Sequence, residues 1–155
     1  MTRYSLIVVL FLGAATVRAD DKTGDEAKKL QGEWQVVEIQ VRGKKLTKEN
    51  DAQTKDMEFV FKDDAMTARS QSSGAERKKT FKLDPSKSPK VIDITSLDGH
   101  EKGKTAACIY KLEKDRLTIC IPYFPPADPS KRPTKFQSGA DDGMMLLVLE
   151  RVPKK

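Results

Sequence analysis

Short runs of alternating apolar and polar residues, separated by turn-forming residues, dominate the chain after Leu30. Alternation with a period of two is the pattern of a β-strand that buries one face. No stretch longer than about ten residues carries apolar residues at the 3.6-residue period of an amphipathic helix. The pattern therefore predicts an all-β fold. The eight predicted strands cover residues 34–41, 57–62, 65–70, 78–83, 91–95, 105–112, 117–121 and 144–152.

The connections between most of the predicted strands are short. They carry turn formers or charged residues, as in Lys62-Asp63-Asp64 and Glu113-Lys114-Asp115-Arg116. Consecutive strands joined in this way predict antiparallel hairpins, and closing the meander into a barrel removes its exposed edges. We therefore predict an eight-stranded antiparallel up-and-down barrel. A β-sandwich is the alternative that the strand pattern leaves open, and the polar segment 45–55 is predicted to be a loop or one short helix.

The N-terminal residues have the composition of an export signal. Arg3 precedes the apolar segment 5–15, and small residues stand at Val17 and Ala19. A basic start, a short apolar region and a small-residue cleavage site are typical of secretory signal peptides, and the apolar region is too short for a transmembrane anchor. We predict a signal peptide over residues 1–19 and a secreted or periplasmic protein. Residues 20–29 are polar and are predicted to be a flexible leader.

The remaining residues, 30–155, are predicted to form one domain, because they suffice for a single core. The formal net charge of the chain is +6 at pH 7, and it falls to +4 when the two arginines of the predicted signal are removed. A basic surface of this size permits contact with an anionic envelope polymer. The basic residues lack the interleaved aromatic side chains of a nucleic-acid platform, so no specific nucleic-acid partner is predicted.

The two cysteines, Cys108 and Cys120, lie on adjacent strands of one predicted hairpin. Export would permit a disulfide between them. If Leu112 pairs with Leu117, however, the two sulfur atoms point to opposite faces of the sheet, because neighbouring positions of a strand alternate in direction. We therefore predict free thiols. A bulge beside Pro122 would shift the register and reverse this prediction.

One short motif stands at the head of the first predicted strand. Gly32-Glu33-Trp34 contains the only tryptophan of the chain. It resembles the Gly-x-Trp step of the lipocalins and their calycin relatives. The resemblance implies that Trp34 closes one end of the barrel and that a basic residue near the last strand, here Arg151, packs across its ring. Such a guanidinium gains a cation–π contact with an indole.

A longer series of segments resembles a narrower family. The segments LQGEWQVVEIQVRGKKL, TFKLDPSKSPKVIDIT, KGKTAACIYKLEKDRLTICI, KRPTKFQS and LLVLERV span most of residues 30–152 in this order. They are similar to a bacterial lipocalin-like domain family of unknown function that is abundant in planctomycetes. The resemblance implies a small calycin-like barrel, and it brings no established activity or catalytic residues. The proline-rich loop YFPPADPSKRP departs from the family pattern by its length.

The sequence contains no catalytic constellation. His100 is the only histidine and stands in a glycine-bearing loop, and the acidic pairs Asp63-Asp64 and Asp141-Asp142 fall at predicted turns. Solvated side chains are ordinary at such places. No motif of a nucleophile, a phosphate-binding loop or a zinc site is present. We predict that the protein is not an enzyme and that it holds no cofactor and no metal.

The interior of the predicted barrel decides between two functions. An eight-stranded barrel is wide enough either to be filled by side chains or to hold one ligand. A cavity would make the protein a binder of a small apolar or amphiphilic ligand, which is the function we favour. A filled barrel would indicate an envelope or interaction protein whose basic surface contacts an anionic polymer or a protein partner. The large side chains that would line the interior are Trp34, Met57, Phe59, Phe61 and Tyr110, with Glu38 and Gln40 also inward unless the first strand bulges.

Overall fold

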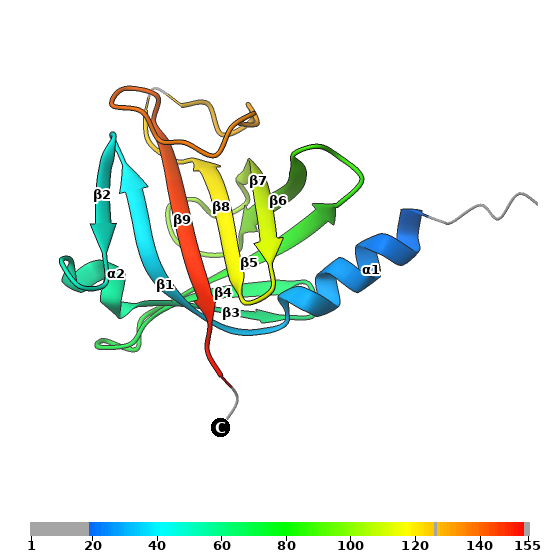
Figure 1. Cartoon of the computed structure of the whole chain (residues 1–155), viewed down its shortest axis with the longest axis horizontal. Coiled ribbons are helices and arrows are strands. Elements are labelled where there is room, and N and C mark those ends of the chain that lie inside the picture. The colour runs from blue at the N-terminus through cyan, green and yellow to red at the C-terminus, as the bar shows by residue number, and fades with distance from the viewer. Residues whose placement is uncertain (1–18, 126, 154–155) are drawn as a thin grey trace, which may run out of the picture.

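The computed structural model describes residues 19–125 and 127–153. Within these ranges the chain forms two helices and nine strands (Figure 1). The helices are α1 (Ala19–Leu30) and α2 (Ala52–Asp56). The strands are β1 (Gly32–Val41), β2 (Lys44–Thr47), β3 (Met57–Lys62), β4 (Ala65–Ser70), β5 (Glu76–Asp84), β6 (Lys90–Ser96), β7 (Thr105–Glu113), β8 (Arg116–Pro122) and β9 (Met144–Arg151).

Eight of these strands, β1 and β3 to β9, form a closed antiparallel barrel in sequential order. Each pairs with its neighbours in the chain, and β9 returns to pair with β1. This confirms the predicted up-and-down barrel and rules out the sandwich. The ninth strand, β2, was not predicted. It pairs with the second half of β1, beyond the point where β3 leaves that edge.

Up-and-down topology places alternate turns at opposite ends of the barrel. One end holds the β3–β4, β5–β6 and β7–β8 turns together with α1, and we call it the helix end. The other holds the β1–β2, β4–β5, β6–β7 and β8–β9 connections, and we call it the loop end. In Figure 1, α1 lies at the right of the view and the long β8–β9 connection lies at the top.

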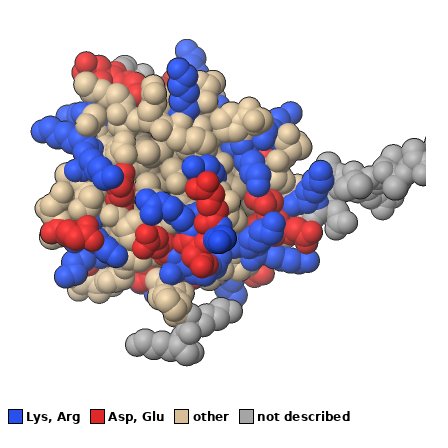
Figure 2. Space-filling model, in the orientation of Figure 1, with Lys and Arg blue, Asp and Glu red and all other residues tan. Residues whose placement is uncertain are grey.

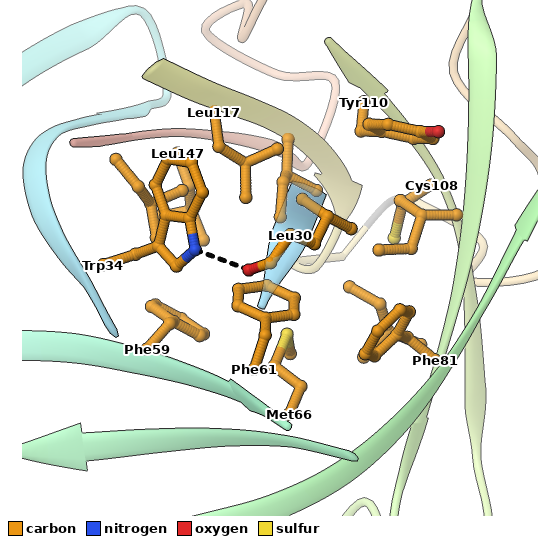
Figure 3. Packing of buried hydrophobic residues seen from close by; sticks show 14 of the residues in the cluster. Leu30, Trp34, Phe59, Phe61, Met66, Phe81, Cys108, Tyr110, Leu117 and Leu147 are labelled. Carbon is orange, nitrogen blue, oxygen red and sulfur yellow. Dashed lines mark hydrogen bonds between the residues drawn. The ribbon is translucent and has the colours of Figure 1, made fainter. Parts of the chain in front are cut away.

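Trp34 and Arg151 close the helix end. The indole of Trp34 is fully buried, and its Nε1 donates to the carbonyl oxygen of Leu30 at 2.8 Å (Figure 3). The guanidinium of Arg151 lies 4.2 Å from the centre of the indole ring and donates to the carbonyl oxygen of Gln31 at 2.8 Å. Gly32 turns the chain between helix and strand with a φ of +114°, a conformation that favours glycine. This is the arrangement that the Gly-x-Trp resemblance implies.

The structure differs from the expected flexible leader, because residues 19–30 form α1. Leu30 is inserted into the interior, and one turn earlier the carboxylate of Glu26 accepts hydrogen bonds from Tyr110 Oη at 3.1 Å and Lys90 Nζ at 3.0 Å. These two contacts on one helix face fix a segment that is otherwise polar. The predicted signal peptide lies outside the described residues, apart from Ala19.

No helix within the described ranges is both long and apolar enough to cross a bilayer.

Side chains fill the helix-end half of the barrel. Phe61 meets Phe81 edge to face, with 5.4 Å between ring centres, and Tyr110 is buried beside them. Figure 3 shows Phe61 beneath Leu30, with Trp34 and Phe59 on one side of it and Phe81 on the other. The predicted interior side chains are therefore core in this half. The buried cluster consists of Leu30, Trp34, Val36, Ile39, Phe59, Phe61, Met66, Phe81, Ile92, Ile94, Cys108, Tyr110, Leu117, Ile119, Leu147 and Leu149.

A bulge in β1 turns two polar side chains away from the interior. The pairing of β1 with β9 skips one residue between Val36 and Glu38, so the alternation reverses there. Ile39 then points inward, and Glu38 lies on the outer face, where it accepts from Gln40 Nε2 and pairs with Lys45 Nζ, each at 2.6 Å. From the sequence we expected Glu38 and Gln40 to face inward unless the first strand bulges. The strand does bulge, and both side chains face outward.

The two cysteines lie on opposite faces of the sheet, as predicted. β7 and β8 pair Leu112 with Leu117, which is the register assumed from the sequence. Cys108 belongs to the interior core, and Cys120 belongs to a second apolar cluster on the outer face. Both thiols are free and buried.

The closure of the helix end predicts a large cost for removing the indole. Trp34→Ala should destabilise the fold by roughly 3–5 kcal/mol, as do other deletions of buried aromatic side chains. Trp34→Phe is the matched control, because it keeps a ring beneath Arg151 while it loses the hydrogen bond to Leu30 and part of the indole volume, and it should therefore cost less than Trp34→Ala. Chemical denaturation of the parent and of the two variants measures these differences in the free energy of unfolding. An unchanged midpoint for Trp34→Ala would contradict the described closure.

The contacts of Glu26 predict a dependence of stability on pH. Burial opposes ionisation of this carboxyl group, but the hydrogen bond and charge of Lys90, with further bonds from Tyr110 and Lys29, lower its pKa below the ordinary 4.5. A lowered carboxyl pKa contributes stability above the unfolded value, and this contribution is lost as the pH falls through the folded value. Glu26→Gln should therefore be less stable at pH 7, by roughly 1–3 kcal/mol. The difference from the parent should shrink below pH 4.5. A constant difference across this range would refute the assignment.

The register of β7 and β8 predicts a thiol count. Burial raises the pKa of Cys108 to about 12, so this thiol should react very slowly in the native protein. Cys120 is buried as well and should be equally protected. Without reductant, the protein should yield two titratable thiols after unfolding and close to none before it. A count of zero after unfolding would show a disulfide and a different register.

Candidate binding site at the loop end of the barrel

Half-buried apolar side chains surround the buried core at both ends of the barrel. Two of them, Leu83 and Leu112, lie at the helix end. The other seven lie toward the loop end and come from seven strands, and we call them the apolar ring. Apolar surface that faces the barrel axis therefore contacts solvent at this end. The apolar ring consists of Val41, Leu46, Met57, Ala68, Ala106, Ile121 and Met145.

Two strands contribute polar residues where the others contribute the apolar ring. On β5 the inward position after Phe81 toward the loop end is Lys79, and on β6 the position after Ile94 is Ser96. Lys79 and Ser96 are direct cross-strand partners, and Lys79 Nζ donates to Ser96 Oγ at 2.7 Å. The pair thus places a half-buried ammonium group beside the apolar ring.

The ammonium group of Lys79 has no carboxylate partner at ion-pair distance among the described residues. Burial lowers the pKa of Lys79 from 10.5, while the more distant charges of Asp98 and Glu101 act in the opposite direction. At the helix end the situation differs, because the inward Lys90 pairs with Glu26 at 3.0 Å. Two lysines therefore face the interior from neighbouring strands, and only the one at the helix end is neutralised by the protein.

Exposed apolar side chains also gather at the loop end. Leu97 is 46% exposed and Tyr123 is 56% exposed, and they are the large apolar residues that the described part of the chain leaves most open to solvent. Leu97 follows β6 and Tyr123 follows β8, so both stand where a strand ends at the loop end. Phe124 packs edge to face against Tyr123, with 4.7 Å between ring centres.

The long β8–β9 connection positions this rim by packing along the outside of the barrel. The pairing of β7 with β8 stops at Ile109 and Cys120, and Pro122 has no N–H with which to continue it. The connection takes over the free edge of β7, where Pro129 accepts from Ala107 N at 2.8 Å. Arg132 completes the attachment by donating to the carbonyl oxygen of Cys108 and to Asp93. Phe136 covers the outer apolar cluster of Ile109, Cys120 and Leu146.

The residues considered for chemistry in the sequence do not converge. His100 is exposed in the β6–β7 connection, and Asp63 lies in the β3–β4 turn at the other end of the barrel. Asp142 accepts from the backbone N–H groups of Gly139 at 2.7 Å and Met144 at 2.8 Å, which is the role of a turn residue. Among residues 19–125 and 127–153, no three His, Cys, Asp or Glu side chains are grouped as metal ligands would be.

A separate groove of roughly 570 Å³ runs beside α1 at the helix end. Its apolar lining comes from Ala27, Phe81 and Leu83. Its walls carry two lysines and two aspartates, so the groove contains charges of both signs and requires none from a ligand. The lining residues are Thr23, Gly24, Ala27, Lys28, Gln31, Asp63, Asp64, Phe81, Lys82 and Leu83. The loop end, which has an unbalanced charge beside apolar surface, is the better candidate for selective binding.

Comparisons with protein-family models, with curated proteins and with solved structures found no significant match to this chain. The likeness to lipocalins therefore depends on the chain itself. It consists of the closed eight-stranded barrel and of the Gly32–Trp34–Arg151 arrangement at its helix end. Sequence reasoning did not single out Lys79 or Ser96. The alternation of β5 contained the necessary signal, because Lys79 stands two residues before the inward Phe81.

Proposed function

We propose that this protein is an exported, non-enzymatic, lipocalin-like binding protein that holds a small amphiphile at the loop end of its barrel. The observation that carries the proposal is the apolar ring. Its side chains face the axis of the barrel from seven strands and are only half-buried, whereas the helix end has two such side chains, Leu83 and Leu112. A ligand that covered the apolar ring would remove this apolar surface from water, which is favourable.

The filled half of the barrel limits how such a ligand lies. Trp34, Phe61 and Tyr110 occupy the space that a deep calyx would offer. The apolar part of the ligand therefore lies against the apolar ring and the rim formed by Leu97 and Tyr123, instead of extending to the helix end. Shallow seating favours a short or flexible chain over a large rigid ring system.

Export and family membership are parts of the proposal that depend on the sequence. Export is supported by the basic, apolar and small-residue regions of the first nineteen residues. Membership in the planctomycete-abundant family is supported by the ordered segments described above and by the barrel that they form. The absence of an activity is supported by the dispersed positions of the polar residues that were considered for chemistry.

An interaction protein with a filled barrel is the second candidate, and the packed helix-end core favours it. Its partner would be an anionic envelope polymer or another protein. Figure 2 shows lysine, arginine, aspartate and glutamate side chains interleaved on one face of the molecule. Such a mixed surface supports a polyanion contact less well than a continuous basic face would. We therefore place amphiphile binding first.

Titration with an uncharged apolar fluorophore, N-phenyl-1-naphthylamine, tests the proposal. The folded, exported protein, freed of lipid, should bind it one-to-one and release it to decanoic acid or decanol. At a hundredfold excess over the dissociation constant, the bound ligand should stabilise the fold by about 2.7 kcal/mol. Ala106→Phe, which fills the apolar ring, should weaken binding by roughly tenfold or more.

Ala65→Phe is the matched control, because the same change is made on an exposed residue of β4 next to the β3–β4 turn. It should leave the affinity unchanged. If no uncharged probe binds the folded protein, or if both variants bind equally well, the proposal fails. Salt-sensitive binding to an anionic polymer would then favour the second candidate.

A further inference from the structure

We infer that Lys79 and Ser96 form the subsite for the head group of the amphiphile, and that this head is a monoanion of the carboxylate type. The inference rests on the proposed function, since it assigns the polar part of the same ligand. It specifies the class of ligand as a single-chain carboxylic acid, such as a fatty acid, and it places the two parts of that ligand on different strands.

The first support is the position of the pair in the apolar ring. Every barrel strand except β5 and β6 contributes an apolar side chain to the apolar ring, with β2 adding one more. On β5 and β6, the inward residues that follow the core residues Phe81 and Ile94 toward the loop end are Lys79 and Ser96. The site is thus polar on one wall and apolar on the rest, which is the layout that an amphiphile needs when its head and chain lie side by side.

The second support is the missing counter-charge. Ser96 is the only hydrogen-bond partner of Lys79 Nζ among the described residues, and it is neutral. A lysine ammonium carries three N–H donors. With one donor directed to Ser96 Oγ, further donors are available to the oxygens of an incoming carboxylate. The hydroxyl of Ser96 can then donate to the same head, because it accepts from Lys79 and retains its own proton.

The third support is the burial of the group. Lys79 is half-buried, and a partly buried ion interacts more strongly with an opposite charge than it does in water. Burial lowers the pKa of Lys79. A bound anion would raise that pKa again, since an opposite charge favours the charged form. Binding of a carboxylate should therefore be accompanied by an upward shift of the Lys79 titration.

The charges around the pair select a monoanion. One ammonium group balances one negative charge, and the other charged side chains that act on it are net negative, because Asp98 and Glu101 outnumber the single positive charge of Arg77. A phosphate monoester carries between one and a half and two negative charges at pH 7, so it would face repulsion from these two acidic residues. An uncharged alcohol could accept a hydrogen bond but would leave the charge of the ammonium unbalanced. A carboxylate head group balances the charge of Lys79 and brings only one negative charge near Asp98 and Glu101.

The test compares ligands that share one chain and differ only in the head. Decanoic acid, decanol and decyl phosphate are titrated into the folded, lipid-free protein by calorimetry, below their aggregation concentrations, at pH 7. The acid should bind more tightly than the alcohol by roughly ten- to a hundredfold, the range for hydrogen bonds to a charged group. It should also bind more tightly than the phosphate.

The variants assign this preference to the pair. Lys79→Met should remove the preference for the acid and leave the affinity for decanol unchanged, and Lys79→Arg should retain most of the preference. Lys82→Met is the matched control, because Lys82 is an exposed lysine on the outer face of the same strand. It should behave as the parent. Thermal unfolding of each variant confirms that the fold is intact, and Lys79 side-chain NMR reports its titration with and without decanoate.

The outcomes separate the inference from the function on which it rests. If neither acid nor alcohol binds, the proposed function itself fails. If acid and alcohol bind equally, or if Lys79→Met keeps the preference for the acid, the head-group subsite is refuted while amphiphile binding stands. If decyl phosphate binds more tightly than decanoic acid, the assignment to a monoanion is wrong.

Discussion

The guanidinium of Arg151 is the contact on which the rest of the structure depends. It stacks on the indole of Trp34 and donates to the carbonyl oxygens of Gln31 and Lys29 at the end of α1, and it also pairs with Asp115 in the β7–β8 turn. One side chain thereby joins the first strand, the last strand, the helix and a distant turn. Without it, the carbonyl groups at the end of the helix would lose partners at the place where the barrel closes.

This closure gives the barrel two unlike ends. At the helix end, the inserted Leu30 and the Glu26–Lys90–Tyr110 contacts fill the interior and neutralise its charge. At the loop end, shorter side chains such as Ala68 and Ala106 leave the apolar ring half-buried, and the charge of Lys79 is not neutralised by an ion pair among the described residues. Stability is thus concentrated at one end, and the features that suit a ligand remain at the other.

Part of this architecture can be predicted from the sequence, because strands show an alternation of apolar and polar residues. The eight barrel strands, the register that separates Cys108 from Cys120 and the pairing of Trp34 with Arg151 all follow from short-range pattern or from a recognisable motif. Two elements do not. α1 is held to the barrel mainly by Glu26 and Leu30, so its sequence lacks an apolar stripe. β2 is only four residues long and depends on β1 for its partner.

The candidate site was missed for a related reason. Lys79 and Ser96 become partners only through the register of β5 and β6, which the pattern of either strand alone does not fix. The bulge in β1 cannot be predicted from the sequence pattern either, because the alternation in QVVEIQV allows the polar residues to lie on either face. Fold class thus follows from local periodicity, whereas the site follows from pairing between strands.

Amide chemical-shift mapping of the folded protein with decanoate tests the central claim most directly. The account predicts that the changes centre on the loop end, at Ala68, Lys79, Ser96, Ala106, Ile121 and Met145, and that α1 is unaffected. Changes centred on Ala27, Lys28 and Phe81 would place the ligand in the groove beside α1 and contradict the account. An absence of changes at saturating decanoate would contradict it as well.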